Sequence, residues 1–163
     1  MPSEKSTNTS DHLSIERQRA LTIVTEELQK LQSHQHERTT EGKLTQVQLM
    51  ALATAVQSYF PLDENETYAM VHASRMEVAK KAIEYETIQI VCQYCVEYLD
   101  NNHPGERDVI VLHLLTGFLH NFSDQSPDVC KVILLQNTYI KTIKEKLKCL
   151  ESTHFVTKQQ QVS

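Results

Sequence analysis

The feature that most constrains the fold of this chain is a helical joint within residues 112–135. An almost wholly apolar stretch ends at Asn121–Asp124, and the pair Ser126-Pro127 then opens a second apolar stretch. A serine can cap the exposed N–H groups at the start of a helix, and a proline at the first helical position leaves no N–H unpaired. The tract therefore predicts two packed helices joined by a tight turn.

The rest of the chain shows helical periodicity and no alternation typical of strands. Three glycines and four prolines among 163 residues are also too few for a turn-rich β fold. We therefore expect an all-α protein. Its expected segments are a disordered lead (1–10), an N-terminal helix (11–33), a polar linker (34–44), a helical domain (45–150) and a disordered polar tail (151–163).

Helices of similar character recur in the same order within the helical domain. The segments 45–60 and 106–122 are apolar almost all round, so each is expected to be buried on most sides. A shorter helix and then an amphipathic helix follow each of them, which indicates two triple-helix units in tandem. In the first unit, the second helix begins at a capping box of Asp63 and Glu66 and runs to about Glu84, and the third is 86–100. In the second unit, the corresponding helices are 126–135 and 138–150.

The N-terminal helix has a short apolar stripe at heptad spacing, made of Leu21, Val24, Leu28 and Leu31. Arg17 interrupts the pattern upstream, so the stripe lasts only about two heptads, whereas a coiled coil usually needs three or four. A helix that packs on or caps the domain is therefore favoured over a coiled coil.

Composition excludes several classes of function. A net charge of −5 gives no overall case for nucleic-acid binding, and no apolar run is long enough for a membrane span. The polar N-terminus lacks the apolar core of a secretory signal, so four reduced cysteines in the cytoplasm, or alternatively the nucleus, are the default. No phosphate-binding loop or catalytic motif is present, and we expect no enzyme, cofactor or metal site.

Three other patterns have both a chemical and a structural interpretation. Cys92 and Cys95 form a CxxC motif, but both fall on the apolar stripe of their helix, so core packing is favoured over a zinc or redox site. His34 and His36 lie in the polar linker and are expected to be solvated rather than metal-bound. The lysines of 141–148 are expected to form a charged outer face rather than a phosphate contact.

The joint resembles those between armadillo repeats. In that family a long third helix ends in Asn-hydrophobic-small, and Asp-x-Ser-Pro and then a Cys or Arg follow. The joint is also similar to those of the Zyg and Zer armadillo-like substrate receptors of cullin–RING ubiquitin ligases. The match covers about a quarter of the chain. The positions that match the motif are Asn121, Phe122, Ser123, Asp124, Ser126, Pro127 and Cys130.

This resemblance implies a short right-handed superhelix of about two triple-helix units whose concave face binds extended protein segments. In peptide-binding armadillo repeats a Trp lies one turn before the Asn, where this chain has Gly117. In the receptor joints the Trp directly precedes the Asn, where this chain has His120, and the chain contains no Trp. The joint thus predicts the architecture more directly than the ligand.

A polar stripe on the helix 106–122 is the best candidate for a binding site. Its members recur at steps of three and four residues on a helix otherwise made of Val, Ile, Leu and Phe, so they share one face. The alternative is that this face is simply the hydrated side of the helix, with Asn121 and Asp124 supporting the turn. We call it the polar seam: His113, Thr116, Gly117, His120, Asn121 and Asp124.

These observations favour a non-enzymatic scaffold that binds a protein or peptide along its concave helical face. A substrate receptor or adaptor of a cullin–RING ligase is the second hypothesis, and a helical enzyme is the least favoured. The last helix, 138–150, has an apolar face that a following helix would normally cover. The alternatives for this face are self-association through that helix, a short member of the repeat class and a truncated product.

Overall fold

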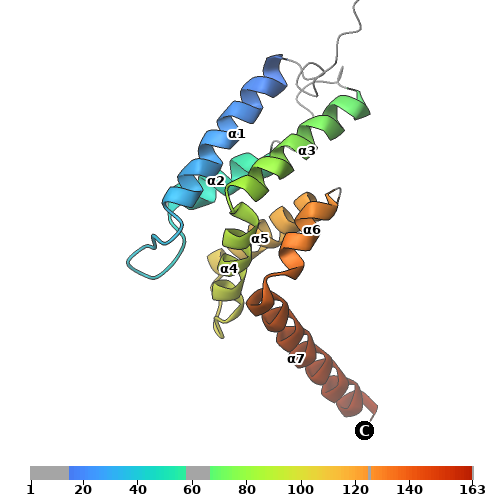
Figure 1. The fold of residues 1–163 in the computed structure, drawn as a ribbon. Coiled ribbons are helices and arrows are strands. Elements are labelled where there is room, and N and C mark those ends of the chain that lie inside the picture. Colours follow the sequence, from blue (N-terminus) through green and yellow to red (C-terminus); the bar gives the residue numbers. More distant parts are fainter. Residues whose placement is uncertain (1–14, 58–66, 125, 163) are drawn as a thin grey trace, which may run out of the picture.

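The structure, a computed structural model, describes residues 15–57, 67–124 and 126–162, with side chains as far as Ser152 (Figure 1). These residues form seven helices and no strand, which confirms the all-α prediction. The helices are α1 (Ile15–Ser33), α2 (Gln46–Gln57), α3 (Tyr68–Glu84), α4 (Thr87–Leu99), α5 (Glu106–Asp124), α6 (Pro127–Leu134) and α7 (Asn137–Val162).

The centre of the core is α4, which packs against α1, α3, α5, α6 and α7. Its apolar stripe is buried at Ile88, Val91, Cys92 and Cys95, and Tyr94 and Tyr98, on the side next to Val91, are buried as well. The prediction that 106–122 would be buried on most sides is wrong. In α5, Leu115, Phe118, Leu119 and Phe122 are buried, but Val109 and Ile110 are 56% and 68% exposed.

The second helix expected to be buried on most sides is also open on one side. The buried residues of α2 are Gln48, Ala51, Leu52 and Ala55, whereas Val47 and Met50 are exposed. Its neighbours α1 and α5 leave one face uncovered by any described helix. An apolar composition shows that a helix can be buried, but its neighbours decide which sides are.

The N-terminal helix packs on the domain as expected, since α1 contacts α2, α3 and α4. Val24, Leu28 and Leu31 are fully buried. Arg17, which was expected to interrupt the stripe, is fully buried as well and so continues it one turn upstream.

The helix α3 begins later than expected, with Thr67 as its N-cap. The Thr67 hydroxyl oxygen accepts a hydrogen bond from the Met70 backbone N–H at 3.3 Å. The predicted capping box of Asp63 and Glu66 lies outside the described residues. The helix ends at Glu84 as predicted, and Glu86, with φ of 58°, turns the chain into α4.

Hydrogen bonds from helix side chains hold the linker 34–44 against the core. The Gln48 amide donates to the carbonyls of His34 (2.7 Å) and Glu37 (2.8 Å). The Tyr94 hydroxyl donates to the Gln35 carbonyl at 2.9 Å, and the Tyr98 hydroxyl accepts from the Leu44 N–H at 3.2 Å. The linker is polar in sequence, yet these contacts give it a fixed path.

The contacts between helices repeat with a shift of three along the chain. The pair α1–α2 corresponds to α4–α5, the pair α1–α3 to α4–α6, and the pair α1–α4 to α4–α7. In addition, α2 packs on its counterpart α5, and α3 packs on its counterpart α6. The helices α1 and α4 therefore have equivalent neighbours. The repeat is incomplete elsewhere among the described helices, because α5 packs on α6 and α3 on α4 without comparable contacts of α2 with α3 or of α6 with α7.

The last helix projects from the rest of the molecule (Figure 1). It was expected to end at Leu150, but α7 continues as a helix to Val162. The segment 151–162 contains no glycine or proline and several good helix formers, so its polarity does not oppose a helix. Within the described residues, no helix is both long and apolar enough to cross a membrane.

Candidate functional site

The polar seam lies on the side of α5 that faces away from the core. His113, Thr116, His120 and Asp124 are exposed, and Gly117 and Asn121 are half-buried. Their positions are opposite Leu115, Phe118, Leu119 and Phe122, which fill the core side of the same helix. All six predicted residues therefore share one accessible face.

The seam offers hydrogen-bonding groups of several kinds. Two imidazoles, an amide and a carboxylate come from His113, His120, Asn121 and Asp124, and each can pair with a peptide group. The Thr116 hydroxyl contributes less, because it donates within its own helix to the Leu112 carbonyl at 2.9 Å. The arrangement suits recognition of polar groups on a partner.

Gly117 leaves an open notch in the middle of the seam. A Cβ placed on this residue would meet no neighbouring described atom within 4 Å, so close packing does not require a glycine here. A glycine inside a helix costs about 1 kcal/mol relative to alanine. Its position suits a partner that must approach the helix backbone closely.

The turn after the seam is held by residues of the joint itself. The Ser126 hydroxyl accepts a hydrogen bond from the Val129 N–H at 3.3 Å, which confirms the predicted cap with Pro127 behind it. The Cys130 thiol donates to the Ser123 carbonyl at 3.2 Å. The hydrogen bonds described in this turn thus come from Ser126 and Cys130, rather than from Asn121 or Asp124.

The CxxC motif is part of the core, as predicted. Cys92 and Cys95 are buried, and burial raises the pKa of each thiol to about 12. Such thiols stay protonated at neutral pH, whereas a nucleophile or a metal ligand must be a thiolate. Among the described residues, no group of three or more His, Cys, Asp or Glu side chains is placed to hold a metal.

The two linker histidines differ in their contacts. The His34 Nδ1 lies 2.8 Å from a carboxylate oxygen of Glu37, and both side chains are partly exposed. His36 is exposed. This arrangement is a local pair in a hydrated linker.

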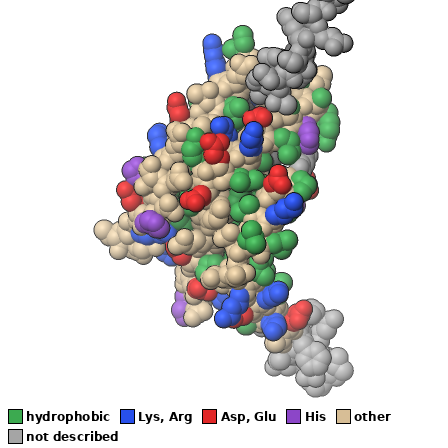
Figure 2. Space-filling model, viewed as in Figure 1, with side chains coloured by type: hydrophobic (Ala, Val, Ile, Leu, Met, Phe, Trp, Pro, Cys, Tyr) green, Lys and Arg blue, Asp and Glu red, His purple; other side chains and the backbone are tan. Residues whose placement is uncertain are grey.

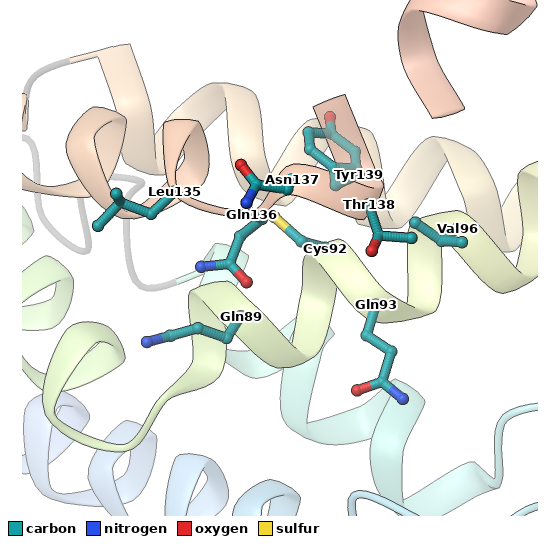
Figure 3. Close-up of a pocket in the computed structure, with 9 residues that line it drawn as sticks. All are labelled: Gln89, Cys92, Gln93, Val96, Leu135, Gln136, Asn137, Thr138 and Tyr139. Atoms are coloured by element: carbon teal, nitrogen blue, oxygen red, sulfur yellow. The ribbon is translucent and has the colours of Figure 1, made fainter. Parts of the chain in front are cut away.

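A polar hollow of about 560 Å³ lies between α4 and the turn from α6 to α7 (Figure 3). Its lining is rich in amides, from Gln89, Gln93, Gln136 and Asn137. The Gln89 side-chain oxygen is buried without a hydrogen-bond partner among the described atoms. No sequence pattern indicates this site, since its residues come from separate segments and the packing of α7 on α4 brings them together.

A second hollow, of about 520 Å³, lies between α1 and α2. The apolar part of its lining is Ile23, Val47 and Met50, all of them exposed. Val47 and Met50 belong to the segment 45–60, which was expected to be buried on most sides, so this surface was missed as well.

Comparisons of the chain with models of protein families, with curated proteins and with solved structures find no match.

Proposed function

We propose that this protein is a non-enzymatic interaction module of armadillo-like architecture that binds a protein segment along α5. The observation that supports it most is the three-helix shift in the packing around α1 and α4, in which α2, α3 and α4 pack on α1 as α5, α6 and α7 pack on α4. A tandem of triple-helix units produces such a shift. In the armadillo interpretation α5 is a third helix that ends at the Asn joint, and α2 is its counterpart.

The face of α5 has the mixture of groups that protein recognition uses. Val109 and Ile110 are exposed at the N-terminal end of the helix and can provide apolar contacts. The imidazoles and the Asn121 amide follow along the same helix and can pair with the backbone of an extended segment. This combination supports a peptide or protein ligand.

The second candidate function is that of a substrate receptor or adaptor in a cullin–RING ligase. Its support is the likeness of the joint Asn121–Cys130, in which Ser126 caps α6 and the Cys130 thiol contacts the Ser123 carbonyl. A cullin or a cullin adaptor would then co-purify with the full chain from cells. Repeated purifications that bring down a ligand of the seam without either of them would eliminate this candidate.

The experiment for the leading proposal selects peptide ligands with the full chain as bait and measures their affinity. The double substitution His120→Ala and Asn121→Ala removes two seam side chains. The matched control, Asn102→Ala with His103→Ala, removes the same residue types from an exposed loop between α4 and α5. We expect the seam variant to weaken binding at least tenfold, which is about 1.4 kcal/mol, and the control to leave it unchanged.

Two results would contradict the proposal. In the first, the folded wild-type chain selects no peptide. In the second, the seam variant and the control bind the selected peptides as tightly as the wild type does. Thermal unfolding of each variant distinguishes a loss of contact from a loss of fold.

A further inference from the structure

The helix α7 has one side that no described helix covers. In the repeated packing pattern, α2 covers α1 and α5 covers α4. The helix α7 is the next counterpart of α1 and α4. Its described contacts are with α4, through its first turns, where Thr142 is buried and Tyr139 packs on the core. The pattern therefore leaves room for one more helix beside α7.

An apolar stripe runs along the uncovered side. Ile140, Ile143, Leu147 and Leu150 recur at steps of three and four residues, so they lie on one face of the helix. The two isoleucines are half-buried, whereas Leu147 and Leu150 are 54% and 66% exposed. Leucines repeated at this spacing are the usual contact of one amphipathic helix with another.

The charge on both sides of this stripe specifies the partner further. Lys144 and Lys148 lie on one side of the stripe, and Lys146 lies on the other. Figure 2 shows lysines gathered over the described part of α7. Residues 137–163 carry five lysines and two acidic residues, whereas residues 1–136 carry 11 basic and 19 acidic residues.

The same charges argue against a second α7 as the occupant. Glu151 also lies beside the stripe, but three lysines against one glutamate leave its edges positive. Two α7 helices packed through their leucines would therefore bring like charges together, which selects against pairing. A helix with acidic residues beside its apolar stripe would instead pair with Lys144, Lys146 and Lys148.

We propose that α7 docks an amphipathic α-helix with acidic flanks, supplied by a partner protein, along Ile143, Leu147 and Leu150. This site is separate from the polar seam and does not depend on it. A helix bound there would occupy the position beside α7 that α2 and α5 occupy beside α1 and α4.

The test uses a synthetic helical peptide of about 20 residues, with Leu and Ile at three-and-four spacing and Glu at the flanking positions. A second peptide of the same composition spreads its leucines around the helix. Fluorescence anisotropy with the full chain measures both. We expect the patterned peptide to bind at least tenfold more tightly than the scrambled one.

Three variants of the chain assign the binding to α7. Leu147→Glu with Leu150→Glu should abolish binding of the patterned peptide. Lys144→Glu with Lys148→Glu should weaken it and reduce or reverse its weakening by salt, because two attractive charge pairs become repulsive pairs that salt also screens. The control Ile23→Glu, which changes an exposed apolar residue of α1, should bind like the wild type.

Several outcomes would overturn this proposal. Equal affinity for the two peptides, or unchanged binding by the leucine variant, would show that the stripe does not recognise a patterned helix. Sedimentation that shows a dimer of the wild-type chain, lost in the leucine variant, would identify a second copy as the occupant. The seam variant His120→Ala with Asn121→Ala should bind the acidic helix normally, so failure here is distinguishable from failure of the seam.

Discussion

The helices α4 and α7 have equivalent places in the packing pattern but opposite surroundings. Both carry apolar residues at steps of three and four. The helix before each differs from the sequence expectation of a short helix in both units, because α3 has 17 residues and only α6, with 8, is short. In α4 this stripe is buried at Ile88 and Val91. In α7 the stripe is exposed at Leu147 and Leu150, where no described helix lies against it.

The difference lies in what surrounds each helix rather than in the pattern itself. Five helices pack on α4, and the linker adds further contacts, with the Arg38 guanidinium 4.8 Å from the centre of the Tyr94 ring. The guanidinium also donates to both carboxylate oxygens of Glu97, at 2.7 and 3.0 Å. An amphipathic stripe is therefore evidence that a helix has a partner, and the partner can belong to the same chain or to another.

The largest expected effect comes from truncating the buried stripe. Ile88→Ala in α4 should lower the free energy of unfolding by about 2–5 kcal/mol, because the removed atoms leave a cavity that surrounding helices cannot fill. Urea unfolding followed by circular dichroism measures it. A loss below about 0.5 kcal/mol would mean that α4 is not the centre of the core.

An intermediate effect is expected from the two buried thiols of α4 at alkaline pH. Burial raises the pKa of Cys92 and Cys95 from 9.0 to about 12, so the unfolded chain loses these protons first as the pH rises. Stability should be unaffected below pH 9 and should fall above it, by up to about 1.4 kcal/mol per pH unit for each thiol.

The measurement compares urea unfolding at pH 8, 9 and 10 in the wild type and in Cys92→Ala with Cys95→Ala. Burial also raises the pKa of Tyr94 and Tyr139 from 10.0 to about 12, so phenols contribute mainly above pH 10. A wild type and a double variant with the same pH dependence between 9 and 10 would show that the thiols are accessible to water.

The smallest effect is expected on the exposed stripe. Leu147→Ala in α7 should change the free energy of unfolding by no more than about 0.5 kcal/mol, as surface substitutions usually do. The same urea titration as for Ile88→Ala measures it, and the two values together give the contrast between the helices. A loss of 2 kcal/mol or more would mean that Leu147 is buried in solution, by another part of the chain or by a second copy.

Sequence reasoning predicted the secondary structure closely where local chemistry decides it. Three local features are present in the structure as predicted: the cap at Ser126, the proline that follows it, and the break between the helices 86–100 and 106–122. Each depends on backbone groups a few residues apart. The core position of Cys92 and Cys95 followed from the periodicity of a helix that is in fact covered. The six residues of the polar seam were placed on one face by the same periodicity.

What sequence reasoning missed depends on contacts between distant segments. It assigned α2 and α5 to the deep core, although each has an open side, and it did not identify Arg17 and Gln48 as buried. Gln48 is buried because its amide meets two carbonyls of the linker, a pairing that local patterns do not encode. The hollow beside Gln89 was missed for the same reason.

Local sequence is enough to predict that this protein is a series of helices, where most of them begin and end, and which residues share a face. These properties arise from hydrogen bonds and steric preferences within a few residues. Which of those faces are covered follows from the packing of the helices, because burial depends on the neighbours that each helix acquires. The stripes of α4 and α7 are similar in sequence, and packing makes one of them core and leaves the other free for a partner.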